Sequence, residues 1–137
     1  MHIMLRLVVA ATLAVCPAAV LADEPCPLRW ETAPFALRGV DGLVQDAVVF
    51  DDGRGPAVYV AGDFGVAGDA LVSNIARWNG LAWEAVGAGL DGEVRALAVF
   101  DDGAGPALYA AGAFTETAAA DGQRTELNNI ARWDGSR

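Results

Sequence analysis

The chain has 137 residues, of which 18 are acidic and 9 basic, and its formal net charge is −9 at pH 7. This balance disfavours a nucleic-acid-binding protein, because affinity for nucleic acid depends largely on cationic contacts to phosphate. The only histidine is His2, so the rest of the chain cannot form a Ser-His-Asp or Cys-His catalytic group or a His-ligated zinc site. The composition therefore disfavours most hydrolytic enzymes.

Residues 1–22 are typical of a signal peptide. Arg6 precedes an apolar run that ends before Pro17, and a small-residue pattern ending at Ala22 precedes Asp23. A membrane anchor is the alternative, but the apolar run is shorter than the roughly 20 residues that a spanning helix needs. We therefore expect a signal-peptide helix, cleavage before Asp23, a secreted, periplasmic or cell-surface protein, and no membrane span after cleavage.

Residues 23–39 form the predicted N-terminal segment of the mature protein. A lone strand is predicted at residues 29–33, which carry the same Trp-Glu pair as Trp83-Glu84. Cleavage would also leave Cys26 as the only cysteine. An odd cysteine in an exported chain suggests a partner outside these residues, and an unpaired thiol is the alternative.

An internal repeat organises the rest of the chain. Residues 40–64 reappear as residues 90–114, with about 15 of 25 positions identical. The pentapeptide Asn-Ile-Ala-Arg-Trp occurs at residues 74–78 and again at residues 129–133. A period of roughly 50 residues, built from short apolar runs and Gly-rich turns, is typical of a β-propeller in which each repeat is one blade.

We therefore predict an all-β fold with one blade over residues 40–89 and a second, truncated blade over residues 90–137. The first strands, at residues 44–50 and 94–100, show little polar alternation and are expected to be buried on both faces between neighbouring blades. The other strands are predicted at residues 57–61, 74–78 and 82–86 of the first repeat and at residues 107–111 and 129–133 of the second.

Two kinds of turn connect these strands. The acidic turns begin with Asp51-Asp52 and Asp101-Asp102, and aspartates of this kind either cap their own backbone or offer oxygen ligands to calcium. Each turn supplies only two carboxylates, which favours capping over calcium binding. The pairs Asn79-Gly80 and Asp134-Gly135 are suited to two-residue type I′ hairpins.

The order of these strands resembles the kelch-type, galactose-oxidase-like propeller blade, and most closely its secreted bacterial versions. The resemblance covers residues 40–137 and departs from the family where a Gly-Gly doublet is expected, since this chain has Ala61-Gly62 and Ala111-Gly112. A propeller needs about 4 to 8 blades to close its ring. The resemblance thus implies an N-terminal fragment of a longer protein, whose partners include further blades of its own full-length chain.

Most residues that recur in both repeats are expected to be structural. Tyr59 and Tyr109 occupy equivalent strand positions, as packing residues do, and Arg77 and Arg132 are expected to pair with the acidic turns. The recurring aromatic residues could bind sugar rings, but regular recurrence favours packing between blades. They are Phe50, Phe64, Trp78, Trp83, Phe100, Phe114 and Trp133.

The loops that differ between the repeats are the better candidates for a ligand site, because scaffolds keep their strands and vary their loops. These loops are residues 65–73 and the longer residues 115–128. A solvated loop with no fixed role is the alternative. The candidate ligand-binding residues are Asp69, Glu116, Asp121, Arg124 and Glu126.

The sequence favours a secreted, non-catalytic binding scaffold with a protein or glycan ligand and no catalytic residue of its own. The first alternative is an extracellular carbohydrate-active or oxidase enzyme whose catalytic residues lie beyond Arg137. The second is a structural surface array. No cofactor is predicted, and calcium is the one metal that the acidic turns could accept.

Overall fold

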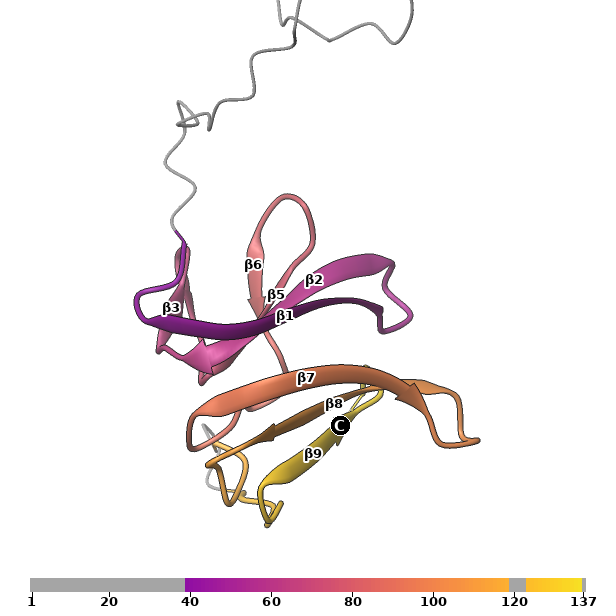
Figure 1. Ribbon diagram of the computed structural model, residues 1–137. Coiled ribbons are helices and arrows are strands. Elements are labelled where there is room, and N and C mark those ends of the chain that lie inside the picture. Colours follow the sequence, from indigo (N-terminus) through magenta and orange to yellow (C-terminus); the bar gives the residue numbers. More distant parts are fainter. Residues whose placement is uncertain (1–38, 119–122, 137) are drawn as a thin grey trace, which may run out of the picture. The chain divides into compact units, whose positions relative to one another are not determined.

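The computed structural model describes residues 39–118 and 123–136, which fall within one compact unit of the chain. The predicted leader and lone strand lie outside the described residues. Within the part that is described, the fold is all-β, with antiparallel sheets and no helix (Figure 1). This confirms the predicted fold class at the level of secondary structure.

The first repeat forms a four-stranded antiparallel sheet in the order β1-β2-β5-β6. Its strands are β1 (Leu43–Asp51), β2 (Pro56–Asp63), β5 (Ile75–Trp78) and β6 (Trp83–Ala85). They match the four strands predicted for this repeat. The segment between β2 and β5, expected as a loop, contains the small hairpin of β3 (Val66–Ala67) and β4 (Ala70–Leu71).

The second repeat forms a three-stranded sheet in the order β7-β8-β9. Its strands are β7 (Val94–Asp101), β8 (Pro106–Gly112) and β9 (Ile130–Trp133). The registers of the two repeats correspond, since Tyr59 pairs with Arg77 in the first and Tyr109 pairs with Arg132 in the second. The extra residues of the second repeat are confined to the connection between β8 and β9, as the sequence predicts.

Both repeats carry an irregularity at the same place in the first strand, after Val44 in β1 and after Val94 in β7. The main chains approach closely there. A Cβ on Gly62 would lie 1.9 Å from the carbonyl oxygen of Leu43, and one on Gly112 would lie 2.1 Å from that of Glu93. Glycine is therefore required at these two positions, because any side chain would collide with backbone.

The two repeats stack face to face. We call the side of each sheet that bears Tyr59 or Tyr109 the tyrosine face, and the opposite side, which bears Trp78 or Trp133, the tryptophan face. Strand pairing and side-chain alternation assign the other residues to these faces. The first repeat's tyrosine face packs against the second repeat's tryptophan face, with β1 beside β7 (Figure 1).

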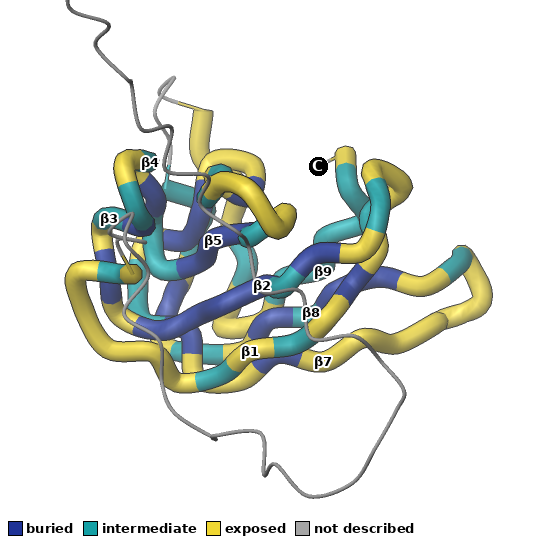
Figure 2. The backbone as a smooth tube through the Cα atoms, turned by 90° about the horizontal axis from the view of Figure 1, so that it is seen from above, coloured by how far each residue is buried: buried dark blue, intermediate teal, exposed yellow. Residues whose placement is uncertain are grey.

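This junction holds the larger of two hydrophobic clusters. Phe50, Tyr59 and Ile75 of the first repeat meet Leu97 and Leu108 of the second, and all five are buried. A smaller cluster covers the other face of the first repeat. Burial therefore concentrates along β2, β5 and β8, as Figure 2 shows.

The expectation that both first strands are buried on both faces is wrong for this structure. β1 and β7 are edge strands of their sheets, and most of their residues are exposed or half-buried. Only one face of each strand meets the other repeat. An apolar run of this length predicts a strand, but it does not reveal how many neighbours the strand has.

The two-residue type I′ hairpins are also wrong. Trp78 pairs with Trp83, so four residues form the loop, and Asn79 lacks the positive φ that a type I′ turn requires at both central positions. Instead, Asn79 Oδ1 accepts hydrogen bonds from the N–H groups of Leu81 and Ala82, both at 2.9 Å. The side chain closes the turn in place of the tight backbone conformation.

Candidate functional site

The first aspartate of each acidic turn holds the turn's own backbone. Asp51 Oδ1 accepts hydrogen bonds from the N–H groups of Gly53 at 2.9 Å and Gly55 at 3.0 Å. Asp101 accepts the two equivalent bonds in the second repeat, at 2.8 and 3.1 Å. The predicted capping role is confirmed for both. Among the described residues, no group of three or more His, Cys, Asp or Glu side chains is placed to hold a metal ion.

The second aspartate of the first turn belongs to a buried polar cluster. The side chain of Asp52 is fully buried, lies 3.6 Å from Nη2 of the buried Arg77, and accepts a hydrogen bond of 3.0 Å from Arg54 Nε. Arg77 also donates to Glu84 Oε2 and to the carbonyl oxygen of Gly55, both at 3.0 Å. Burial raises the pKa of Asp52, but the bonds and charge of Arg54 outweigh it and hold the pKa at about 2.

The second repeat builds the same cluster in a more open setting. The Tyr109 hydroxyl donates to Asp102 Oδ2 at 2.8 Å, and Arg132 Nε lies 3.3 Å from the same oxygen. Arg132 also donates to Asp134 Oδ2 at 3.0 Å. The predicted pairing of the repeated arginines with the acidic turns is confirmed in both repeats, and the role is structural.

A third pair of repeated aspartates lies at the opposite end of the sheets. Asp41 Oδ1 accepts hydrogen bonds from the N–H groups of Gly65 and Val66, at 2.9 and 2.8 Å. Asp91 Oδ1 accepts the equivalent bonds from Thr115 and the residue after it, at 2.8 and 3.0 Å. Backbone hydrogen bonds of this kind lower the pKa of Asp91. These carboxylates therefore anchor the variable loops.

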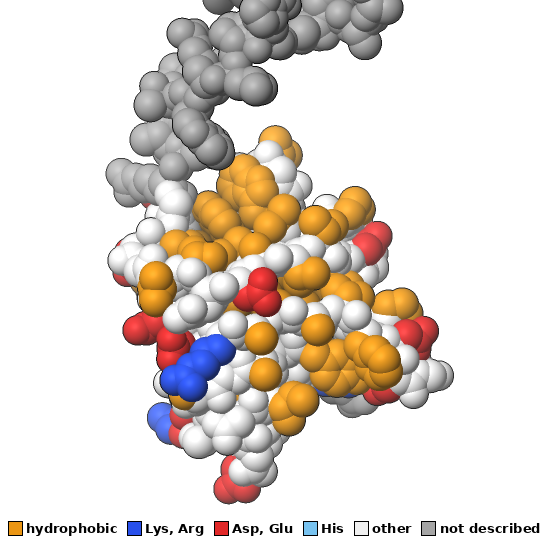
Figure 3. Space-filling view, in the orientation of Figure 1, with side chains coloured by type: hydrophobic (Ala, Val, Ile, Leu, Met, Phe, Trp, Pro, Cys, Tyr) orange, Lys and Arg blue, Asp and Glu red, His pale blue; other side chains and the backbone are white. Residues whose placement is uncertain are grey.

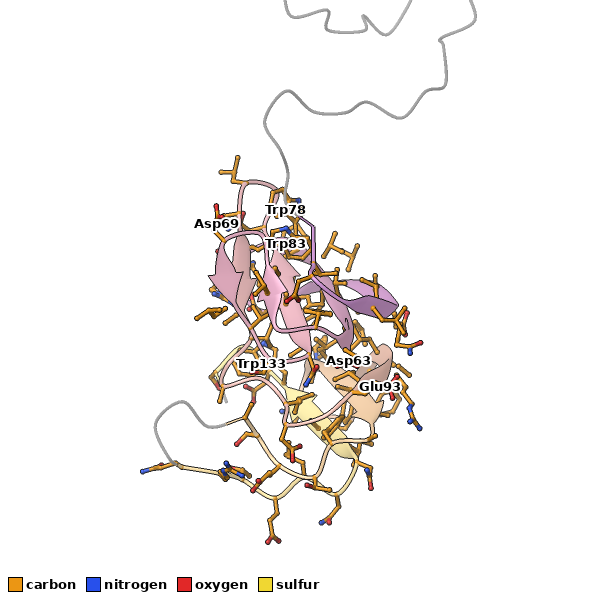
Figure 4. The ribbon with its side chains drawn as sticks, turned by 90° about the vertical axis from the view of Figure 1, so that its left-hand side faces the viewer. Asp63, Asp69, Trp78, Trp83, Glu93 and Trp133 are labelled. Carbon is orange, nitrogen blue, oxygen red and sulfur yellow. The ribbon has the colours of Figure 1, made fainter. Side chains whose placement is uncertain are left out.

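The recurring aromatic residues pack within the fold. Phe50 and Tyr59 contact each other at 5.7 Å between ring centroids, and Trp78 and Trp83 at 5.3 Å. Figure 4 shows the two tryptophans together and Trp133 apart from them. Trp133 belongs to the cluster between the repeats. Packing, the role that recurrence favours, is confirmed for Phe50, Trp78, Trp83 and Trp133, whereas Phe100 is 61% exposed and departs from it.

An open cleft of about 440 Å³ lies where the two repeats meet at the variable-loop end. Its apolar part comes from Leu71, Val72 and Val86, and its polar part from Ser73, Asp91 and Arg124. One wall is the connection between β6 and β7. That wall is fixed because Leu90 donates to the carbonyl oxygen of Ser73 at 3.0 Å, and Gly89 accepts from Ala118 at 3.0 Å.

The structure brings together some of the predicted ligand-binding residues. Arg124 lines the cleft and forms an ion pair with Glu116, while Glu116 and Glu126 face each other in an isolated β-bridge. Asp69 is exposed in the turn between β3 and β4 and does not line the cleft. Asp121 lies outside the described residues.

Sequence reasoning missed the connection between the repeats. Ala85, Gly87 and Ala88 line the cleft together with Gly89, yet they read as an unremarkable small-residue linker. Gly89 also contacts Ser73 so closely that a Cβ on it would lie 2.6 Å from the Ser73 Cβ. The cluster of small residues in a linker was the available signal, since small residues permit close approach of main chains.

The arrangement offers binding rather than general acid–base chemistry. Asp91 is the carboxylate of the cleft lining, and its lowered pKa keeps it ionised near neutral pH, whereas a general base works best with a pKa close to the working pH. Arg124 Nη1 already pairs with Glu116, and such a pair can recognise a charged or polar group through hydrogen bonds.

Comparisons of the chain with protein-family models, with curated proteins and with solved structures found no match. In the described part of the chain, no helix is long and apolar enough to cross a membrane. The cleft therefore has to be interpreted from its own geometry.

Proposed function

We propose that this chain is an exported, non-catalytic scaffold of kelch-type propeller repeats that binds a protein ligand in the cleft between two repeats. Each repeat is one blade in this proposal. The antiparallel order of β1, β2, β5 and β6, the matching register of β7 to β9, and the face-to-face stacking of the repeats support it. The proposed family rests on the kelch-type resemblance of the sequence. The proposed export rests on the predicted leader.

One observation carries the binding function: the repeated polar side chains hold the fold, whereas the cation that lines the cleft comes from a residue that is not repeated. Asp51 caps a turn, Asp52 and Arg77 form a buried cluster, and Asp41 anchors a loop. Arg124 belongs to the longer second loop, is 62% exposed and has no counterpart in the first repeat. A scaffold that varies only its loops presents its specific contacts there.

The lining favours a protein segment over a glycan. Leu71, Val72 and Val86 supply aliphatic surface, and none of the described residues that line the cleft is aromatic. Sugar rings are usually recognised by stacking on aromatic side chains, which this lining does not offer. An extended peptide with a small apolar residue next to an acidic one fits the aliphatic floor beside Arg124.

Peptide display tests the proposed site. Random peptides are selected on the wild-type chain, with counter-selection on Arg124→Ala, and the selected peptide is titrated into isotopically labelled protein. We expect saturable amide shifts at Ser73, Gly87 and Gly89, and a loss of about tenfold in affinity for Arg124→Ala, which corresponds to about 1.4 kcal/mol.

The matched control is Arg95→Ala, because Arg95 is 65% exposed, forms a similar ion pair with Glu93 at 3.0 Å, and does not line the cleft. It should bind like the wild type. Equal losses for both variants, or shifts outside the cleft, would overturn the site. Oligosaccharides form a parallel arm: saturable binding of one of them with the same shifts would make the ligand a glycan.

Export has its own test. The leader predicts cleavage before Asp23 in a host that secretes the protein. N-terminal sequencing of exported protein should begin at Asp23, and exported protein that still begins at Met1 would contradict the signal peptide.

A further inference from the structure

The two repeats expose equivalent residues to very different degrees. Phe50 is 5% exposed and Ile75 4%, because the second repeat covers them. Their counterparts on the second repeat's tyrosine face, Phe100 and Ile130, are 61% and 58% exposed. The second repeat therefore presents an uncovered copy of the surface that the first repeat buries.

On the tryptophan faces the difference in exposure is reversed, since the second repeat is the more buried of the two. Val94, on the second repeat's tryptophan face, is completely buried, whereas its counterpart Val44 is 45% exposed. Figure 3 shows hydrophobic side chains gathered over the end of β7 and again over the region of β2 and β6. The part of the molecule described here thus carries one uncovered tyrosine face and, on the first repeat, a tryptophan face that is only partly covered.

The contact between the repeats is heterologous, because a tyrosine face meets a tryptophan face rather than its own kind. Contacts of this type leave one free face of each kind and can add further units in the same direction. The two uncovered faces of this chain are consequently complementary to each other, although they belong to different repeats.

We propose that the tyrosine face of the second repeat binds the tryptophan face of the first repeat of another copy of this chain. The contact continues the observed packing between the repeats. Phe100 and Ile130 would be covered as Phe50 and Ile75 are, and the other copy's Val44 would be buried as Val94 is.

The equivalent residues of the two repeats fix how the two copies would be aligned in this contact. In the observed contact, Tyr59 and Trp133 belong to the same hydrophobic cluster, and burial raises the pKa of the Tyr59 hydroxyl, as Asp52 does. The other copy's Trp78, the counterpart of Trp133, would lie over Tyr109 in the same way. Gly80 would meet the second acidic turn as Gly135 meets the first, and its surroundings leave that space open, with no atom within 4 Å of a Cβ.

One difference makes the contact between copies weaker than the contact between repeats. Asp46 Oδ2 accepts a hydrogen bond of 2.8 Å from the Leu97 backbone N–H across the observed junction. Alanine occupies the equivalent position of the second repeat, Ala96, so this bond cannot form between copies. The shared apolar surface remains, and self-association should appear as protein concentration rises.

Complementation between two variants tests the proposal. Ile130→Arg damages only the tyrosine face, and Val44→Arg damages only the tryptophan face. Arginine also reduces the net charge of −9, so lost association cannot come from added repulsion between copies. Sedimentation at moderate salt should show concentration-dependent association of the wild type and about tenfold or more weaker association of each variant alone.

An equimolar mixture of the two variants is decisive. The intact tyrosine face of Val44→Arg can bind the intact tryptophan face of Ile130→Arg, so the mixture should form one-to-one heterodimers that do not grow further. The conservative variants Ile130→Leu and Val44→Ile should associate like the wild type. A wild type that stays monomeric at all concentrations, variants that associate like the wild type, or a mixture that stays monomeric would each overturn the proposal.

Discussion

Gly135 lies so close to the main chain of Asp52 that a Cβ on it would fall 2.3 Å from the Asp52 carbonyl oxygen. The two residues belong to different repeats, so this contact joins the segment after β9 to the first acidic turn. Gly80 is the counterpart of Gly135 and has nearly the same φ, +96° against +97°, with no atom within 4 Å of its Cβ position. Alanine substitutions at these two glycines therefore distinguish the cost of a positive φ, which both share, from the cost of crowding between the repeats, which only Gly135 meets.

The first prediction concerns these two glycines. Gly80→Ala should lower the free energy of unfolding by about 1 kcal/mol, the cost of alanine at positive φ. Gly135→Ala should cost a further 1 to 3 kcal/mol or so, because the new methyl group must push the repeats apart. Urea melts of both variants measure the difference. Equal losses would show that Gly135 is not packed against the first repeat.

The second prediction concerns the repeated arginines. Arg77→Met leaves the buried Asp52 without one of its cations and should cost about 3 to 5 kcal/mol. Arg132→Met removes the equivalent group from a more exposed cluster and should cost much less, because solvent screens exposed ion pairs. Chemical denaturation of the two variants compares these losses, and a larger loss for Arg132→Met would contradict the difference in burial.

The third prediction concerns acid. Burial raises the pKa of Asp52, but the hydrogen bonds of Arg54 and Tyr59 and the charge of Arg54 together outweigh it, so the folded pKa is about 2 against an ordinary value of 3.8. A lowered folded pKa stabilises the protein above the unfolded pKa, and that stabilisation is lost as the pH falls from about 4 to about 2.

Asp52→Asn removes this titration. The variant should be less stable than the wild type at neutral pH, and the gap between the two should narrow as the pH falls through this range. Urea melts across the range provide the measurement. A gap that stays constant with pH would mean that Asp52 is not paired in the folded protein.

The fourth prediction concerns calcium. Asp51 Oδ1 is already occupied by the N–H groups of Gly53 and Gly55, and Asp101 Oδ1 by the equivalent pair. A ligand that binds only the folded state raises stability. We therefore expect the same Tm in excess calcium and in excess EDTA. A higher Tm with calcium that Asp51→Asn abolishes would assign a metal site to the acidic turn.

The sequence predicted local structure well, because local structure depends on neighbours along the chain. The short apolar runs of β2 and β8, the prolines that begin them, and the aspartates that cap the acidic turns act within a few residues. The repeat added a second copy of each signal. The hairpin after Trp78 was predicted less well, since Asn79 can close either a tight type I′ turn or the four-residue loop that forms.

The candidate site was predicted only in part. Arg124 and Glu116 were expected from the loop that differs between the repeats; Arg124 lines the cleft and forms an ion pair with Glu116. Ser73, Gly87 and Gly89 were not expected. They belong to the cleft because the second repeat is packed against the first, and no pattern within either segment encodes that contact.

The sequence by itself determined the strands, the acidic turns and the equivalence of the two repeats, because these follow from short apolar runs, backbone preferences and hydrogen bonds between residues close along the chain. Only the tertiary structure decided which copy of each residue is buried. Ile75 and Ile130 lie in identical pentapeptides, yet one is covered and the other is exposed. The reason is physical: burial depends on what lies across the face of a sheet, and the stacking of one repeat on the other covers one tyrosine face and leaves the other open.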